Sequence, residues 1–269
     1  MATKKKRVRT KKDASPMLIE ERRQHVLARI QQEGRVLVAD LSESLGISRI
    51  TIRKDLDNLE SRGLLQRTHG GALAPQANAS VDPSLQVKER RQFREKQRIA
   101  EAAAKLVTEG QCVLLDSGTT TTAIAKALKA FKQLTVITNA VNIATELASS
   151  GFEVILTGGT LRQNSSSLVG PLAEEALAEL NADILFLGVD GFDPEVGVTT
   201  PNVLESRVNR AMVKASRRVV AVCDSTKFSR RSLALIVPPA AIHTVITDSG
   251  ASGEVLALLR SAGIEVIVV

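Results

Sequence analysis

Seven short apolar runs in the C-terminal part of the chain constrain its fold more than any other feature of the sequence. Each run is rich in Val, Ile or Leu, and stretches of helical length, such as TTAIAKALKAF and ESRVNRAMVKAS, lie between several of them. Apolar strands that alternate with helices are typical of a mainly parallel sheet with helices on its faces. We therefore expect an α/β fold here. The runs are CVLLD, LTVIT, EVILT, DILFLGVD, VVAVCD, HTVIT and IEVIVV.

Small, hydroxylic or charged residues follow five of these runs, at the ends of the strands where parallel sheets bind ligands. Helix capping is the ordinary explanation for one such turn, but five at corresponding ends of a sheet favour a binding site. The stretch DSGTTTT offers backbone N–H groups, hydroxyls and a helix N-terminus to a phosphate. The five turns are DSGTTTT, TNA, TGGTLR, GVDG and DSTKF, which begin at Asp116, Thr138, Thr157, Gly188 and Asp224.

Composition narrows the kinds of ligand and compartment. The chain has no Trp, no Tyr and six Phe, so it offers few aromatic faces for a neutral sugar ring or an unpaired base. Neither G-x-G-x-x-G nor G-x-x-x-x-G-K-[ST] occurs, which argues against a dinucleotide or nucleoside triphosphate site. Cys112 and Cys223 lie within apolar runs and are expected to be inert core residues. We expect no metal and no cofactor.

No apolar stretch approaches the roughly 18 residues that a membrane span requires. We therefore expect no membrane partner and a cytoplasmic protein. The net charge is +7, and residues 1–15 contribute +6 of it. We interpret residues 1–17 as a disordered basic tail that attracts phosphate backbones regardless of sequence. A solubilising extension with no specific partner is an equally good reading of the tail alone.

The N-terminal part predicts three helices, in LIEERRQHVLARIQQE, VADLSESLG and SRITIRKDLDNLESRG. In the third, Ser48 is a good N-cap, and Ile52, Leu56 and Leu59 share the inward face. Two helices joined by a Gly-containing turn match a helix-turn-helix whose second helix enters the major groove. The following GLLQRTHGGALA predicts a hairpin, or wing, with Gly70 and Gly71 at its tip. A three-helix module that binds another protein is the alternative.

The outward face of the third helix carries the residues expected to read DNA. Arg49 and Lys54 can reach guanine edges or phosphates, and Ile50 suits a thymine methyl group. Asp55 is poorly placed facing DNA, so we expect it to pair with a nearby Arg. The predicted DNA-binding residues are Ser48, Arg49, Ile50, Thr51, Arg53, Lys54, and Arg67 and His69 of the wing.

The stretch SRITIRKDLDNLESRGLLQRTHGGA resembles the winged helix-turn-helix of the DeoR family of bacterial repressors. The family pattern has a small residue, then Thr-aliphatic-Arg-basic-Asp-Leu, then a Gly-Gly wing, and it matches from Ser48 to Leu56 and from His69 to Gly71. The larger part resembles the sugar-phosphate-sensing domain of the same family through DSGTTT, VITNAVNIA, LTGGTLR, LGVDGFD and VVAVCDSTKF. That domain is similar in fold to ribose-5-phosphate isomerase and the CoA-transferases. LFLGVDGFDPEVGVTTPN looks closest to regulators of amino-sugar operons.

The domain organisation follows from these stretches. APQANASVDPSLQVKERRQF is rich in Ala, Pro, Ser and Gln and lacks helical periodicity, so it reads as a linker. We expect a tail at 1–17, a winged helix-turn-helix at 18–74, a linker at 75–93 and an effector-binding domain at 94–269.

The resemblance implies a phosphorylated sugar or amino sugar as effector. Its phosphate is expected on the turn after Asp116, with Arg162 and Lys227 supplying positive charge, and its other polar groups are expected to meet Asn139 and nearby carboxylates. The predicted effector-binding residues are Asp116, Ser117, Gly118, Thr119, Thr120, Asn139, Gly158, Gly159, Arg162, Asp190, Glu205 and Lys227.

The expected function is repression of a sugar or amino-sugar operon, relieved by the effector. The expected partners are double-stranded operator DNA and other copies of the chain, as a dimer or a tetramer. We expect no enzyme, because VTTPNVLES stands where the isomerase has a glycine-flanked lysine. Two alternatives stay open: a sugar-phosphate isomerase with an accessory DNA-binding domain, and an activator or architectural protein without a small ligand.

Overall fold

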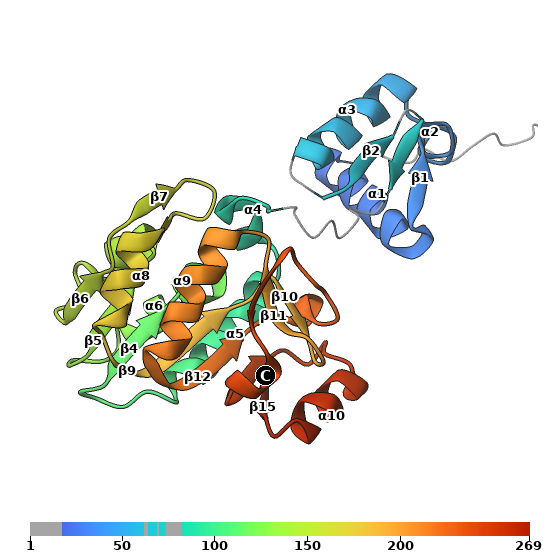
Figure 1. Ribbon diagram of the computed structural model, residues 1–269. Coiled ribbons are helices and arrows are strands. Elements are labelled where there is room, and N and C mark those ends of the chain that lie inside the picture. The colour runs from blue at the N-terminus through green and yellow to red at the C-terminus, as the bar shows by residue number, and fades with distance from the viewer. Residues whose placement is uncertain (1–17, 62–63, 69, 74–81) are drawn as a thin grey trace, which may run out of the picture. The chain divides into compact units, whose positions relative to one another are not determined.

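The computed structural model describes residues 18–61, 64–68, 70–73 and 82–269. The chain divides into two compact units, Met1–Gln76 and Ala77–Val269. Figure 1 shows the elements of both units. Each unit has its own apolar core.

The smaller unit contains the three predicted helices around one core. Gly34 and Gly46 adopt left-handed conformations (φ of 73° and 66°) and end the first two, as expected of glycine after a helix. Ile52, Leu56 and Leu59 are fully buried, which confirms the predicted inward face of the third helix. The helices are α1 (Ile19–Glu33), α2 (Val38–Leu45) and α3 (Arg49–Ser61).

A three-stranded antiparallel sheet completes the smaller unit. The predicted hairpin is present, and a strand that the sequence analysis missed pairs with its second arm, in the order β1-β3-β2. At Gly71 a Cβ atom would lie 2.0 Å from the carbonyl oxygen of Val36, so only glycine allows this pairing. The strands are β1 (Arg35–Leu37), β2 (Gln66–Thr68) and β3 (Gly71–Leu73).

The larger unit is built on a seven-stranded sheet, and its strands are the seven predicted apolar runs. All neighbouring strands are parallel, in the order β15-β14-β12-β9-β4-β5-β6. The direction of the strand order changes between β4 and β9, which makes their carboxyl ends the switch point of the sheet. The strands are β4 (Cys112–Leu115), β5 (Thr135–Thr138), β6 (Glu153–Leu156), β9 (Ala182–Gly188), β12 (Ser216–Val222), β14 (Thr244–Thr247) and β15 (Glu265–Val268).

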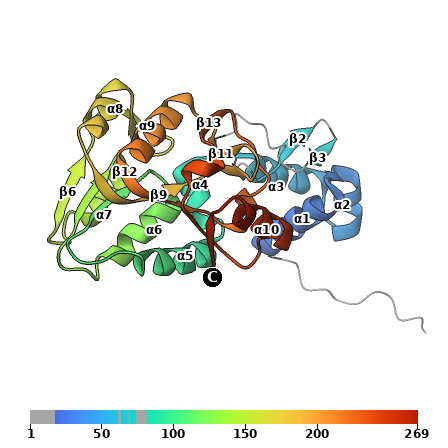
Figure 2. The same ribbon diagram turned by 60° about the horizontal axis from the view of Figure 1, so that its bottom comes forward.

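Helices cover both faces of this sheet (Figure 2). In β4, Val113 and Leu115 join the core beneath α5, α6 and α7, whereas Leu114 joins the core beneath α8, α9 and α10. Because both faces are buried, the strands are apolar throughout instead of alternating with polar residues. The helices are α5 (Phe93–Ala104), α6 (Thr119–Leu128), α7 (Val141–Leu147), α8 (Pro171–Ala178), α9 (Val203–Lys214) and α10 (Gly253–Ser261).

Two small antiparallel sheets, which the sequence analysis missed, follow the carboxyl ends of β6 and β9. At Gly159 φ is 119°, and a Cβ atom there would lie 2.8 Å from the carbonyl oxygen of Val169, so this turn requires glycine. One sheet pairs β7 (Thr160–Arg162) with β8 (Ser167–Val169), and the other joins β10 (Gly191–Asp193), β11 (Gly197–Thr200) and β13 (Ala234–Val237). Short 3-10 turns occupy η1 (Ser225–Lys227) and η2 (Pro239–Ala241).

The stretch expected to be a linker contains a helix, α4 (Leu85–Arg90). The Leu85 N–H donates to the Asn164 carbonyl at 2.9 Å, and Asn164 Nδ2 donates to the Asp82 carbonyl at 2.7 Å. These bonds hold the segment beside the loop that follows β7 (Figure 1). The absence of helical periodicity here misled the prediction, because a six-residue helix is too short to show a period. Among the described helices none is long and apolar enough to cross a bilayer.

Candidate DNA-binding face and effector site

The outward face of α3 carries positive charge that the rest of the described chain leaves unpaired. Arg49, Arg53 and Lys54 are exposed and have no ion pair with any described residue. Ile50 is 65% exposed on the same face. Such a face is suited to phosphate contacts and to an apolar contact in the major groove.

Hydroxyl groups fix the start of α3. The Thr51 N–H donates to Ser48 Oγ at 3.2 Å, so Ser48 is the predicted N-cap. The two hydroxyls also lie 2.9 Å apart and are hydrogen-bonded to each other. Ser48 and Thr51 therefore position the N-terminal turn of α3, and Arg49 and Ile50 project from that turn.

Asp55 is structural, as predicted. Its carboxylate is 2% exposed and pairs with Arg22 (Nε to Oδ2, 2.5 Å) and with Arg23 (Nε to Oδ1, 3.1 Å) on α1. A buried carboxylate with two cationic donors locks α3 to α1. The orientation of the DNA-facing helix therefore depends on an ion pair in the core of its own unit.

Arg67 of the wing is held by the smaller unit itself. Its Nε lies 2.9 Å from Asp57 Oδ1 on α3, and its Nη1 donates to the Gly71 carbonyl at 2.6 Å. The Arg67 N–H also donates to Glu60 Oε1 at 2.8 Å. These contacts fasten the wing to α3, so Arg67 would have to share its guanidinium to contact DNA. His69 lies outside the described residues.

The turn after β4 forms the N-terminus of α6 and has the properties of an anion site. The Thr121 and Thr122 hydroxyls donate to the Gly118 carbonyl at 3.0 and 2.6 Å, which fixes the turn. The hydroxyls of Ser117, Thr119 and Thr120 make no hydrogen bond within the described structure. These three groups, together with the first N–H groups of the helix, can bind a phosphate.

Asp116 lies at the switch point of the sheet and is 1% exposed. A Cβ atom on Gly188, the last residue of β9, would lie 3.2 Å from Asp116 Oδ1, so the two strand ends are in close contact. Burial raises the pKa of Asp116 well above its usual range, and the nearby charges of Asp190 and Glu205 act in the same direction. Its Oδ1 has no hydrogen-bond partner, which leaves a buried polar atom for a ligand.

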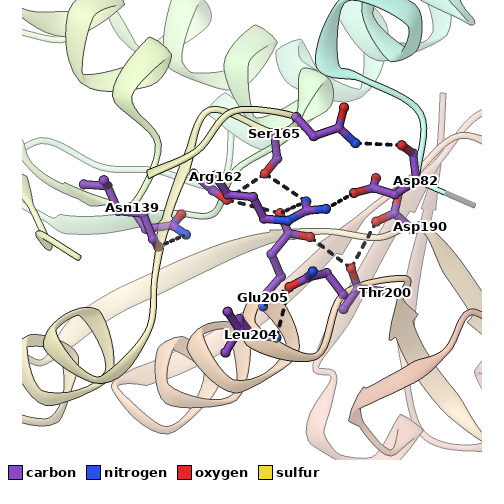
Figure 3. Close-up of polar contacts among 12 residues, drawn as sticks. Asp82, Asn139, Arg162, Ser165, Asp190, Thr200, Leu204 and Glu205 are labelled. Carbon is purple, nitrogen blue, oxygen red and sulfur yellow. Dashed lines mark hydrogen bonds and ion pairs between the residues drawn. The ribbon is translucent and has the colours of Figure 1, made fainter. Parts of the chain in front are cut away.

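Arg162 pairs with one carboxylate of the predicted site, Glu205, and with one that the sequence analysis missed, Asp82. Its Nη1 donates to Glu205 Oε1 at 3.0 Å, and its Nη2 donates to Asp82 Oδ2 at 2.5 Å (Figure 3). Burial disfavours the ionised form of Asp82, but the charges of Lys88 and Arg162 outweigh burial and lower its pKa. Arg162 is therefore paired with two carboxylates, one from the loop before α4 and one on α9.

Lys88 of α4 joins the same cluster. Its Nζ lies 2.8 Å from Asp190 Oδ1 and 3.2 Å from Asp82 Oδ1. Burial opposes protonation, but Asp190 and Asp82 outweigh it and raise the pKa of Lys88. We call the five charged side chains of this group the charged cluster. Its members are Asp82, Lys88, Arg162, Asp190 and Glu205.

Hydroxyl groups surround the carboxylate of Glu205. Ser167 Oγ donates to Oε1 at 3.1 Å, and Thr200 Oγ1 lies 3.3 Å from Oε2 and 3.2 Å from Asp190 Oδ2 (Figure 3). The Ser165 and Ser167 hydroxyls are 2.7 Å apart. These donors compensate the burial of the carboxylate, whose side chain is 8% exposed.

Asn139 and the Gly158–Gly159 turn shape the edge of the site. Asn139 is fully buried, and its Nδ2 donates to the Leu168 carbonyl at 3.1 Å, which ties the end of β5 to β8. Its Oδ1 has no hydrogen-bond partner. Asn139 Oδ1 and Asp116 Oδ1 are thus two buried, unpartnered oxygens on the loops that the sequence analysis selected.

Lys227 is not part of the charged cluster. It lies in η1, after β12, and its charge acts on Lys96, which is 5% exposed. Lys96 Nζ donates to the carbonyls of Lys88 and Arg91, both at 2.5 Å. Burial lowers the pKa of Lys96 to about 8; Asp224 opposes this, and Lys227 and Arg91 reinforce it. A second concentration of positive charge therefore lies at the end of β12.

Sequence reasoning missed several residues of the site. Ser165, Ser167 and Thr200 lie beyond the selected turns, on hairpins with no strong sequence pattern. The Asp-Pro-Ser sequence at 82–84 is a helix-start signal that could have revealed α4, because Ser commonly precedes a helix. In the described part of the chain no group of three His, Cys, Asp or Glu side chains could hold a metal ion.

Comparisons with known families match both units. The model described as "DeoR C terminal sensor domain" matches residues 91–249, and the model described as "DeoR-like helix-turn-helix domain" matches residues 22–78.

Whole-length relatives agree with these matches. The chain is 42% identical to the "Putative aga operon transcriptional repressor" of Escherichia coli O157:H7, over 93% of each chain. It is 38% identical to the "HTH-type transcriptional regulator GlpR" of Haloferax volcanii, over 93% of this chain and 98% of the relative. The "Glycerol-3-phosphate regulon repressor" of Escherichia coli is 30% identical, over 91% of this chain and 97% of the relative.

Solved structures are more distant. A ribose 5-phosphate isomerase A from Methanocaldococcus jannaschii has 15% identity and a TM-score of 0.38, over 50% of this chain and 54% of that chain. The Pyrococcus horikoshii translation initiation factor eIF-2B has 14% identity and a TM-score of 0.43, over 84% and 86%. Because both scores are below 0.5, the description of the fold rests on the strand order of the chain itself.

The whole-length relatives are named as regulators, which agrees with the prediction that this chain is not an enzyme. The two matched models account for both the α3 face and the unit that holds the charged cluster. The chain belongs to the DeoR family of transcriptional regulators, as its motifs predict.

Proposed function

We propose that the chain is a cytoplasmic repressor that binds operator DNA through α3 and is released by a phosphorylated sugar or amino sugar. One observation carries the proposal: a helix face with unpaired cations lies in one unit, and a turn with unpaired hydroxyls and buried free oxygens lies in the other. The first arrangement suits a polyanion and the second a small anionic ligand. The relatives named as repressors of an aga operon and of a glycerol-3-phosphate regulon support this division.

The effector's phosphate would bind at the N-terminus of α6. Ser117, Thr119 and Thr120 would donate hydroxyl hydrogen bonds, and the helix terminus would supply N–H groups and a favourable dipole. The sugar would extend toward the free oxygens of Asp116 and Asn139. Its hydroxyl or amino groups are the natural donors to such acceptors.

The charged cluster disfavours the isomerase alternative. A catalytic base needs a carboxylate that is free to take a proton from the substrate. Asp190 and Glu205, two of the candidate carboxylates, are instead occupied by Lys88, Arg162 and Thr200. A network of paired charges suits a site that changes partners on binding better than one that moves protons.

We also propose that the repressor is a homo-oligomer assembled through the larger unit. One short helix reads too few bases for useful specificity, so DNA-binding helices of this kind act in pairs. Sedimentation of the full chain would decide between a dimer and a tetramer. A monomer at the concentration that occupies operator DNA would exclude the proposal.

The proposed function is tested by titrating phosphorylated sugars and amino sugars into the protein bound to DNA from upstream of its own gene. We expect one compound to weaken DNA binding by roughly 5- to 150-fold, the usual range of coupling between sites. The double variant Thr119→Ala, Thr120→Ala should bind DNA normally and lose this response. Thr145→Ala, at an exposed threonine of α7, is the matched control. An intact response in the double variant would exclude the α6 site, and no response to any compound in the native protein would exclude an effector of this class.

A further inference from the structure

We propose that Asp82 is an internal counter-ion which the effector's phosphate displaces from Arg162, and that this exchange releases the segment leading out of the DNA-binding unit. The inference rests on the proposed function and names how the site is coupled to DNA. Asp82 and Lys88 lie within residues 79–90, which neither family model matches. The site therefore includes side chains from the first residues of the larger unit, outside both matched models.

The segment is fastened to the larger unit at four points. Asp82 pairs with Arg162, and Lys88 pairs with Asp190. Asn164 binds the main chain on both sides of Pro83, at the Asp82 carbonyl and the Leu85 N–H. Two of these four points are ion pairs with residues expected to meet the effector.

The charges of the cluster do not balance. Three carboxylates face two cations, so one negative charge is uncompensated in the ligand-free protein. A phosphate that approaches Arg162 would repel Asp82, because like charges at short range disfavour each other strongly in a partly buried site. The Arg162–Asp82 pair and an Arg162–phosphate pair are therefore alternatives.

The surroundings of the two carboxylates indicate which partner of Arg162 is exchanged. The Asp82 side chain is 11% exposed and is attached to a short helix, whereas Glu205 is 8% exposed and is further held by Ser167 and Thr200. Glu205 would stay in place as the inner partner. Asp82, whose carboxylate pairs with Lys88 and Arg162, is the outer partner that can leave.

The position of α4 connects this exchange to the phosphate turn. α4 packs against α6, whose N-terminus is that turn. Lys96 holds the carbonyls of Lys88 and Arg91, so the corner between α4 and α5 is anchored from inside the larger unit. When the Asp82 end is released, the segment would move about this anchored corner.

Release lengthens the tether between the units. The six residues 82–87, which precede the anchored Lys88 carbonyl, would span up to about 20 Å at full extension, at about 3.3 Å per residue. In a homo-oligomer with two DNA-binding units, a longer flexible tether lowers the effective concentration of the second unit at its half-site, roughly as the −3/2 power of length. The operator affinity then falls without any change in the DNA-binding face itself.

The test compares Asp82→Asn with Asp183→Asn, a matched control at the opposite, amino end of β9. Without effector, amide hydrogen exchange over residues 85–90 should be faster in Asp82→Asn than in the native protein, and operator affinity should fall at least about fivefold. Lys88→Gln removes the ion pair with Asp190 that fastens the same segment, so it should also speed exchange and lower operator affinity. It replaces Asp82→Asn in the test if that variant does not fold. The control should match the native protein in both measurements.

With the effector found by titration, the native protein should exchange faster over residues 85–90, and Asp82→Asn should bind the effector at least about fivefold more tightly than the native protein does. Inorganic phosphate alone forms a separate arm that shows whether the anion suffices.

If ligand-free exchange and operator affinity are the same in Asp82→Asn and Asp183→Asn, the inference fails. It also fails if a native protein that responds to an effector shows unchanged or slower exchange over residues 85–90. A native protein that responds to no sugar phosphate contradicts the proposed function, while the ligand-free comparison still decides whether Asp82 holds the segment.

Discussion

The two units of this regulator treat charge in opposite ways. The α3 face exposes Arg49, Arg53 and Lys54 without a partner among the described residues, whereas the larger unit pairs Arg162 and Lys88 with three carboxylates. A protein that binds a polyanion gains from charges that stay hydrated until DNA releases their counterions. A site that encloses a small ligand must bury its charges, and buried charges need partners. The contrast suggests that DNA binding depends on single side chains and effector binding on a network.

The largest expected effect concerns Asp55 of the smaller unit, whose ion pairs with Arg22 and Arg23 resemble those of the larger unit. Asp55→Ala leaves Arg22, which is 8% exposed, buried without its carboxylate. Breaking such a pair should lower the free energy of unfolding of the smaller unit by about 3–5 kcal/mol. Urea denaturation followed by circular dichroism would measure it.

Asp57→Ala is the matched control for Asp55→Ala. It also removes an ion pair with an arginine, Arg67, but the side chain of Asp57 is 61% exposed. This change should cost less than about 1 kcal/mol. Similar losses from Asp55→Ala and Asp57→Ala would show that burial does not distinguish the two pairs.

The second prediction concerns single side chains on α3. Arg49→Ala and Ile50→Ala should each reduce the preference for operator over random DNA by about 1–3 kcal/mol, because each removes a contact to a base edge. Arg53→Ala should weaken binding to both DNAs alike, because a phosphate contact carries no sequence information. Fluorescence anisotropy with the two DNAs at fixed salt measures the difference. If all three variants lost equal affinity for operator and random DNA, the base contacts assigned to Arg49 and Ile50 would be contradicted.

The smallest expected effect per pH unit is on the free energy of unfolding, and it concerns the buried carboxyl of Asp116 in the larger unit. The pKa of Asp116 is raised well above the value of 3.8 expected for an unfolded chain, so the folded protein binds the extra proton. The contribution of Asp116 to the free energy of unfolding is fully present below the pKa that this group has in the unfolded chain. It is lost as pH rises through the higher pKa of Asp116 in the folded protein. The free energy of unfolding then falls by at most about 1.4 kcal/mol per pH unit. Asp116→Asn lacks this slope. Urea denaturation of both proteins across the acidic to neutral range should give a stability difference that grows in favour of the variant as pH rises, and a constant difference would contradict the assignment.

Most of the fold could be predicted from the sequence, because its signals are local. The seven apolar runs became the seven strands of the parallel sheet, since a strand buried on both faces must be apolar at every position. The inward face of α3 follows from helical periodicity alone, and the pairing of Asp55 follows from its position on that helix. β1 escaped notice because a three-residue strand has too few positions to alternate.

The candidate site was harder to predict, because its contacts join distant positions. The turns after the strands could be located, but the pairing of Arg162 with Asp82 joins residues that are eighty positions apart. Arg162 was expected to supply positive charge to a phosphate, and the sequence contains no sign that Asp82 pairs with it. Charge pairing of this kind depends on which loops the sheet order brings together, and only the structure reveals that.

The ion pairs of Asp82 and Lys88 have a practical consequence for protein engineering. Sensors are commonly rewired by joining the DNA-binding domain of one regulator to the ligand-binding domain of another. A junction placed between the two matched families, after residue 78 and before residue 91, could import a foreign sequence in place of Asp82 and Lys88. The chimera would then retain the helices of both matched regions and lack α4 and two charges of its sensor. The crossover point that keeps this site whole lies before Asp82.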